Sequence, residues 1–273
     1  MKLPKLIFSL LFLVIFAVSA FSQDAMTTRV LQSDNSIIRI EYVFNGYTTE
    51  DVKINGDSYL WLKANGFAST MVPGEPEIPI FRASVVIPDL AAMNFRIISE
   101  ESEIIQTGKI MPSKGHMTRN IDPNSVPYTF GKIYSTDGFY PANLIKLDEP
   151  YIVRDLRGMT VQVNPIQYNP VKNQLKIYRR VVIELYPQSG KAPVNPFYRS
   201  TPLTKVTNEF APIYRALFLN YGIGLTRFDS IPEPGKMLVI CPTAYMTGIQ
   251  PFVQWKQQRG LNVTVAEYPT VTG

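Results

Sequence analysis

The chain has 273 residues, 27 basic and 22 acidic side chains, one histidine and one cysteine. A single cysteine excludes an intramolecular disulfide, and with one histidine it cannot supply the four ligands of a structural zinc site. The basic residues are scattered, and no segment combines aromatic and basic residues as nucleic-acid-binding modules do. We therefore expect a fold stabilised by a hydrophobic core, without nucleic acid or a cofactor.

The first 22 residues carry the pattern of a secretory signal. Lys2 and Lys5 precede an apolar run over residues 6–20, which ends in small residues. Fifteen residues are too few for a membrane span of about 20, and no second run of that length follows. We expect residues 1–22 to be removed and the product to be secreted, periplasmic or on the cell surface, with no membrane partner. Loss of the two lysines lowers the formal net charge from +5 to +3.

Residues 37–186 alternate between apolar and polar positions and are interrupted by Gly, Pro and Asn at short intervals. This pattern predicts β-strands. In "QLKIYRRVVIELY", one face carries the five apolar side chains of Leu175, Ile177, Val181, Ile183 and Leu185, and the opposite face carries Lys176, Arg180 and Glu184. One dry and one wet face per strand indicate a mainly β fold, an antiparallel β-sandwich over residues 23–222.

The sandwich is predicted to end in a helix over residues 208–222, "NEFAPIYRALFLNYG", where apolar residues recur at helical spacing. Asn208 is a suitable N-terminal cap and Gly222 a suitable end. Residues 223–235 have two prolines and no periodicity, which predicts a cleavable linker.

Residues 236–273 predict a strand, a helix and a second strand, which is the start of a parallel α/β sheet. Thirty-eight residues cannot bury a parallel sheet covered on both faces. We therefore expect this segment to be the opening βαβ unit of a truncated α/β domain.

His116 and Cys241 are the only residues that could form a cysteine-peptidase dyad. They fall in different predicted domains, and the aliphatic neighbours of Cys241 predict an inert, buried thiol. The carboxylates of Glu100, Glu101 and Glu103 lack the spacing of a calcium loop. The chain on its own is therefore not expected to be an enzyme. An alternative function is a stand-alone secreted module that binds a glycan or a cell-surface protein through Tyr59 and Trp61.

Three stretches, "IMPSKGHMTRNIDPNSVPYTFGKIY", "YIVRDLRGMTVQVNPIQYNPVKNQLKIY" and "KMLVICPTAYMTGIQPFVQWKQQRGLNV", resemble the gingipain-type cysteine peptidases. The resemblance covers the propeptide, from about Ile37 to Arg227, and the first βαβ of the caspase-like peptidase domain. It implies an inhibitory, chaperone-like propeptide that keeps a zymogen silent by covering the cleft of its cognate peptidase domain, in cis in the precursor. The family's catalytic His and Cys lie beyond this chain, and calcium is implied only for the peptidase domain.

The resemblance also assigns roles to basic residues. In Arg-specific members, a basic residue on a propeptide loop enters the specificity pocket, and Arg119 in "MTRN" matches that position. Lys114, five residues earlier, could serve a Lys-specific pocket instead, and His116 lies between them on the same inhibitory loop. Arg227 matches the site at which the family's propeptide is released, in a linker whose exposure follows from its composition.

Overall fold

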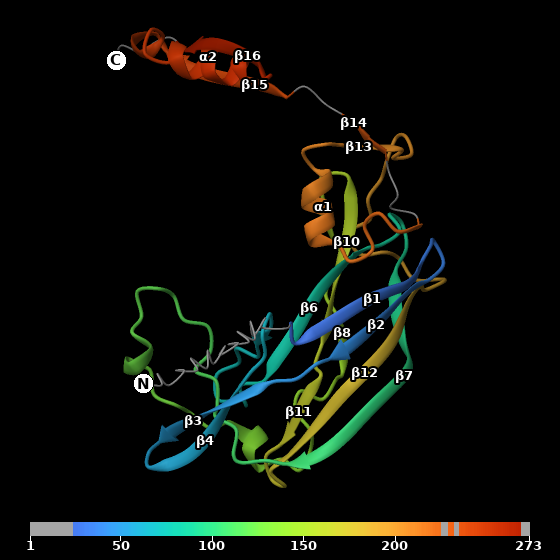
Figure 1. Cartoon of the computed structure of the whole chain (residues 1–273), viewed down its shortest axis with the longest axis vertical. Coiled ribbons are helices and arrows are strands. Elements are labelled where there is room, and N and C mark those ends of the chain that lie inside the picture. Colours follow the sequence, from blue (N-terminus) through green and yellow to red (C-terminus); the bar gives the residue numbers. More distant parts are fainter. Residues whose placement is uncertain (1–23, 225–228, 232–234, 269–273) are drawn as a thin grey trace, which may run out of the picture.

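A computed structural model of the protein describes residues 24–224, 229–231 and 235–268, so the predicted signal segment lies outside the described residues. Two five-stranded antiparallel sheets form the body of the molecule (Figure 1). The first sheet has the order β1-β2-β12-β11. Strand β7 is the fifth strand of this sheet and also pairs with β12. Its strands are β1 Met26–Ser33, β2 Ile38–Phe44, β7 Met93–Gln106, β11 Ile166–Asn169 and β12 Gln174–Pro187.

The second sheet has the order β5-β6-β10-β8, with β9 also paired to β10. Its strands are β5 Ala68–Ser69, β6 Pro79–Val86, β8 Ile145–Leu147, β9 Tyr151–Val153 and β10 Leu156–Val163. Buried side chains from both sheets form one continuous core, for example Ile40 of β2, Ile183 of β12 and Val161 of β10. The expected antiparallel β-sandwich is therefore confirmed.

The alternation along β12 is confirmed on its apolar side and wrong at one polar position. Each of the five apolar residues predicted to share a face is at most 1 % exposed. Glu184, predicted to face water, has a side chain that is only 1 % exposed. It lies between Arg39 of β2, at 2.6 Å, and Arg96 of β7. The two long arginine stems cover the carboxylate and exclude water from it.

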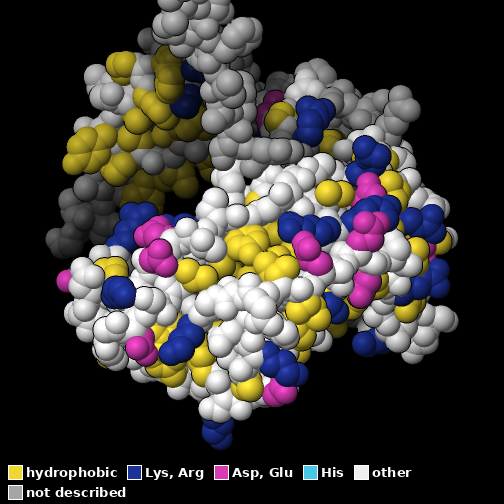
Figure 2. Space-filling model, turned by 60° about the horizontal axis from the view of Figure 1, so that its bottom comes forward, with side chains coloured by type: hydrophobic (Ala, Val, Ile, Leu, Met, Phe, Trp, Pro, Cys, Tyr) yellow, Lys and Arg dark blue, Asp and Glu magenta, His cyan; other side chains and the backbone are white. Residues whose placement is uncertain are grey.

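A second ion-pair row crosses the same three strands. Arg180 of β12 contacts Glu41 of β2 at 2.7 Å and Glu101 of β7 at 3.3 Å. On the face shown in Figure 2, Lys and Arg side chains likewise lie beside Asp and Glu side chains. The polar face of the first sheet thus carries basic and acidic side chains that pair with one another.

The β3–β4 hairpin projects from the sandwich and has a small core of its own. Its strands are β3 Thr48–Ile54 and β4 Asp57–Lys63. Asn55 and Gly56 connect them with positive φ angles of 51° and 91°, as a two-residue hairpin turn requires. Ile54 and Tyr59 pack with Met111 in a satellite cluster next to the main core. The hairpin is therefore fixed to the sandwich by packed side chains.

Arg157, in the "RDLRG" motif, ties two irregular segments to β10. Its side chain is fully buried. The guanidinium donates hydrogen bonds of 2.5–2.9 Å to the carbonyl oxygens of Pro88, Ala91, Val194 and Asn195. A buried cation is tolerated here because backbone carbonyls accept its N–H groups.

The predicted helix over residues 208–222 is much shorter than expected. Helix α1 spans Ala211–Leu217, and the residue before it, Phe210, caps it without a side-chain hydrogen bond. Asn208 is therefore not the cap. The chain reaches the helix through a turn in which the Phe210 N–H donates to the Thr207 carbonyl oxygen at 3.1 Å.

The early end of α1 has a tertiary cause. Phe218 is extended and bridges to Ser84 of β6, and the Leu219 N–H donates to the Ser84 carbonyl oxygen at 2.9 Å. The Phe218 ring occupies a notch at Gly158, where an added Cβ would lie 2.4 Å from the ring. Pairing with β6 stops the helix well before Gly222.

The expected linker over residues 223–235 contains a short strand. Strand β14, Asp229–Ile231, pairs in parallel with β13, Lys205–Thr207. Further along, β15 Lys236–Pro242, the 3-10 turn η4 Thr243–Tyr245, α2 Gln250–Gln258 and β16 Asn262–Tyr268 complete the chain's described part. Strands β15 and β16 are parallel and adjacent, which confirms the predicted βαβ unit. Among the described helices, none is long and apolar enough to cross a membrane.

Candidate functional site

The segment that contains the single histidine is a loop, residues 114–130, whose two ends meet at one glycine. The Gly74 N–H donates to the Ser113 carbonyl oxygen at 2.9 Å, and the Gly131 N–H donates to the Gly74 carbonyl oxygen at 2.7 Å. Two 3-10 turns lie in and after the loop, η1 Pro123–Ser125 and η2 Lys132–Ser135. A 17-residue excursion is therefore anchored at its base to a single backbone position.

Three glycines make this close approach possible. Gly74 has φ +78°, and a Cβ there would lie 3.2 Å from the Gly131 nitrogen, while one on Gly131 would lie 3.0 Å from the Gly74 oxygen. Gly115 has φ +82°, and its Cβ would lie 2.6 Å from Cγ of Pro73. The positive φ angles at Gly74 and Gly115 disfavour any other residue, and a side chain at Gly131 would push against the Gly74 carbonyl. This requirement was not predicted from the sequence, although "PGEPE" and "SKGH" contain turn-forming residues that indicate it.

Arg119 lies at the tip of a tight turn in the loop. The Ile121 N–H donates to the Thr118 carbonyl oxygen at 3.1 Å, which places Arg119 and Asn120 at the two central positions. The Thr118 hydroxyl lies 2.5 Å from the Asn120 side-chain oxygen. Arg119 itself is exposed and makes no hydrogen bond or ion pair with the described residues. Its guanidinium is available to a partner.

The other two basic candidates of the loop differ from Arg119 and from each other. The Lys114 ammonium donates to the Pro123 carbonyl oxygen at 2.8 Å and lies 4.2 Å from the centre of the Tyr128 ring. Lys114 is half-buried, and its two contacts connect it to other residues of the same loop. His116 is exposed, and it makes no hydrogen bond to any described residue.

The loop and the β3–β4 hairpin enclose a pocket of about 730 Å³, which we call the loop pocket. Both structures project at the same end of the sandwich (Figure 1). Trp61 of β4, Met71, Met111 and Tyr128 provide apolar walls, and Ile121 closes the loop side. Glu77 lies in the lining, and burial raises the pKa of its carboxyl. The pocket is thus mainly apolar and lies directly beside the Arg119 turn.

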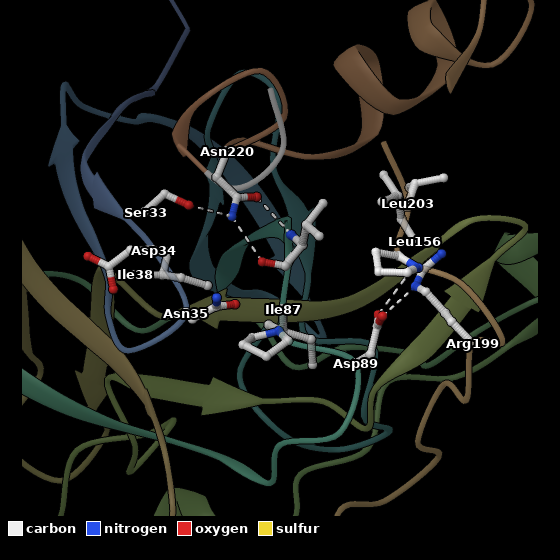
Figure 3. Close-up of a pocket in the computed structure, with 13 residues that line it drawn as sticks. Ser33, Asp34, Asn35, Ile38, Ile87, Asp89, Leu156, Arg199, Leu203 and Asn220 are labelled. Atoms are coloured by element: carbon white, nitrogen blue, oxygen red, sulfur yellow. Dashed lines mark hydrogen bonds and ion pairs between the residues drawn. The ribbon is translucent and has the colours of Figure 1, made fainter. Parts of the chain in front are cut away.

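A second crevice, of about 360 Å³, lies where the chain after α1 meets the sandwich (Figure 3). The Asn220 side chain accepts from the Val86 N–H at 2.7 Å and donates to the Val86 carbonyl and the Ser33 hydroxyl. Asp89 and Arg199 form an ion pair on its other side. These polar side chains make their hydrogen bonds and ion pair with one another or with the backbone of Val86. The crevice is therefore structural, because these contacts hold the segment after α1 against the sandwich.

The remaining candidates are accounted for by packing. Cys241 is 5 % exposed in β15, as expected for a buried strand residue, and Figure 1 shows β15 far from the 114–130 loop. Tyr59 is 9 % exposed, and Trp61 packs against the same satellite cluster, so the two do not form an open aromatic platform. No group of three metal-ligating side chains occurs among the described residues. Arg227 lies outside the described residues.

Comparison with known proteins agrees with this architecture. The family model Propeptide_C25 matches residues 21–221, a range that includes both sheets and helix α1. The chain belongs to the Propeptide_C25 family. This family is that of the propeptide rather than the catalytic unit, and the matched residues end before β15.

The chain is similar to gingipains of Porphyromonas gingivalis. Gingipain R2 sequences of two strains are 35 % identical over 70 % of this chain and 30 % identical over 90 % of it. A Lys-gingipain is 26 % identical over 94 % of the chain. The chain spans 26 % and 34 % of the two gingipain R2 sequences and 15 % of the Lys-gingipain.

Two solved structures share the fold. One is the complex of P. gingivalis RgpB pro- and mature domains, with a TM-score of 0.64 and 27 % identity, covering 71 % of this chain and 96 % of that chain. The other concerns the zymogenic latency of gingipain K from P. gingivalis, with a TM-score of 0.53 and 25 % identity, covering 59 % and 92 %. This protein is therefore a gingipain-type propeptide.

Proposed function

We propose that this protein is the exported latency propeptide of a gingipain-type cysteine endopeptidase and that Arg119 occupies the specificity pocket of the peptidase. The observation that carries the proposal is the isolation of Arg119 at the tip of a loop with an anchored base. An arginine pairs with a buried carboxylate through two charge-assisted hydrogen bonds. Two solved relatives, one described as a complex of pro- and mature domains and one as an insight into zymogenic latency, support the latency role.

The geometry favours Arg119 over Lys114 as the residue presented to the peptidase. Withdrawing Lys114 from the loop would break its hydrogen bond to Pro123 and its contact with Tyr128. Arg119 has no such internal contacts to lose. We therefore expect the cognate pocket to prefer arginine.

The turn also supports inhibition without rapid cleavage. Arg119 and Asn120 lie in the middle of a turn closed by Thr118 and Ile121. Nucleophilic attack on the bond after Arg119 requires alignment of the carbonyl with the catalytic thiolate. The hydrogen bond between Thr118 and Ile121 resists the backbone change that this alignment requires. The loop therefore binds like a substrate and is cleaved slowly.

The proposal extends to two processing steps. Residues 1–22 would direct export and be removed, and cleavage after Arg227 would release the propeptide. An Arg-preferring peptidase would recognise both Arg119 and Arg227, so release can follow from the enzyme's own activity. Folding the sandwich before the peptidase domain would also allow a chaperone-like role. N-terminal sequencing of the exported and processed chains tests both cleavage positions.

The decisive experiment measures inhibition of the mature domains of gingipain R2 and of a Lys-gingipain by residues 23–273. The unmodified chain should inhibit gingipain R2 more strongly. Arg119→Ala should raise the inhibition constant on the order of 100-fold, about 3 kcal/mol, because a charged pair is lost from a desolvated site. Arg29→Ala, which removes an exposed arginine of β1, is the matched control. An unchanged constant for Arg119→Ala would overturn the assignment.

A further inference from the structure

The loop pocket has the character of a docking site, and it adjoins the residue proposed to enter the peptidase. Met71 is 54 % exposed and Ile121 is 40 % exposed, and both line the pocket. Exposed apolar side chains gathered around one pocket can mark an interaction surface. The flexible thioethers of Met71 and Met117 can adapt to the shape of a bound group.

The floor of the pocket is rigid. Met111 is 5 % exposed and belongs to the satellite cluster, and Trp61 and Tyr128 pack against that cluster. The Lys63 ammonium lies 3.9 Å from the centre of the Trp61 ring on the hairpin. Protein-binding hot spots are pockets of this kind, in which fixed walls receive a single anchoring side chain.

The identity of the partner follows from continuity with the inhibitory loop. Arg119 and Ile121 belong both to the pocket lining and to the turn that presents the arginine. When Arg119 enters the specificity pocket of the peptidase, the peptidase residues around that pocket come into contact with the opening of the loop pocket. No other class of partner is required to explain why this surface is apolar.

We propose that the loop pocket receives an apolar side chain from the surface of the cognate peptidase domain, beside the specificity pocket, and so forms a second anchor of the latent complex. This inference rests on the proposed inhibitory function. The two anchors have different roles. Arg119 selects the peptidase by charge. The loop pocket lengthens the lifetime of the complex because it buries apolar area.

The test measures dissociation rates of residues 23–273 from the mature domain of gingipain R2. Met71→Glu places a charge on the pocket rim outside the loop and should speed dissociation at least tenfold, whereas Met71→Leu should retain slow dissociation. Ile98→Glu, at an exposed apolar position of β7, is the matched control and should have no effect. Thermal melting of each variant establishes that the fold is intact.

The possible outcomes separate this inference from the proposed function. If the unmodified chain does not inhibit, the proposed function fails. If Arg119→Ala weakens inhibition but Met71→Glu behaves like Ile98→Glu, only the second anchor is overturned. Glu77→Gln should leave dissociation unchanged. Faster dissociation of that variant would show that the pocket takes a cationic group and would overturn the apolar assignment.

Discussion

The ammonium group of Lys114 is bonded to the carbonyl oxygen of Pro123, nine residues further along the chain, at 2.8 Å. This contact joins the outgoing half of the 114–130 loop to the returning half. Arg119 lies between the two joined positions, so the hydrogen bond closes residues 114–123 into a ring that contains the Arg119 turn. The lysine that the sequence offers as a competitor of Arg119 thus holds the loop around it.

Replacing Lys114 by methionine should convert the inhibitor toward a substrate. Lys114→Met keeps most of the aliphatic stem but removes the hydrogen bond and the cation over Tyr128. The looser loop should allow gingipain R2 to cleave after Arg119 at least tenfold faster, because the bond can reach the geometry of attack more often. Mass spectrometry of the products measures that cleavage. Lys114→Arg, which keeps the donor and the cation, should restore slow cleavage. Equal rates for all three proteins would remove Lys114 from this role.

Substitution of Gly115 should loosen the loop at its base. In Gly115→Ala, the new methyl group would meet Cγ of Pro73 at 2.6 Å, and the residue would keep a positive φ. We expect a loss of about 1–3 kcal/mol in the free energy of unfolding, measured by denaturant titration. Gly138→Ala is the matched control, because an added Cβ there has no atom within 4 Å. A Gly115→Ala protein as stable as this control would show that the loop base adjusts freely.

Removal of the buried cation of Arg157 should destabilise the sandwich. Arg157→Met fills much of the same space but leaves the four backbone carbonyls without their donor. Hydrogen bonds from a charged group contribute about 1.5–3 kcal/mol each in favourable cases, and the released desolvation cost offsets part of them. The free energy of unfolding should therefore fall by about 2–4 kcal/mol. A methionine variant of equal stability would mean that these segments hold their shape without the arginine.

The Glu184 site should make stability depend on pH in the acidic range. Hydrogen bonds from Arg39, and then from Arg96, hold the pKa of the Glu184 carboxyl below its ordinary 4.5, against the opposing effect of desolvation. The unfolded chain therefore takes up this proton first as the pH falls. The stabilising effect is complete above the ordinary pKa and is lost as the pH decreases through the lower folded value.

The difference in unfolding free energy between the unmodified protein and Glu184→Gln should thus be largest near neutral pH and shrink below about pH 4.5. Denaturant titrations at several pH values measure it. A difference that stays constant down to the acid limit would show that the two arginines do not favour the ionised carboxylate.

Alternation along β12 was predictable because every second side chain of a strand points to the same face, whatever the strand pairs with. The βαβ order of residues 236–268 was equally predictable, since a continuous apolar run and a helical pattern are local signals. The burial of Glu184 was not, because the two arginines that cover it come from β2 and β7, 145 and 88 residues away. The length of α1 was misjudged for a similar reason, since Ser84 of β6 ends the helix at Phe218.

The same division holds for the candidate site. Residue types and their order placed Arg119, Lys114 and His116 on one polar loop and left open which of the two longer basic side chains a partner would receive. Only the folded chain separates Arg119 from Lys114, because the distinguishing contacts, at Pro123, Tyr128 and Gly74, form when the loop closes on itself and on the sandwich. Local sequence determines which chemical groups are present, while long-range backbone contacts determine which of them remain free to bind.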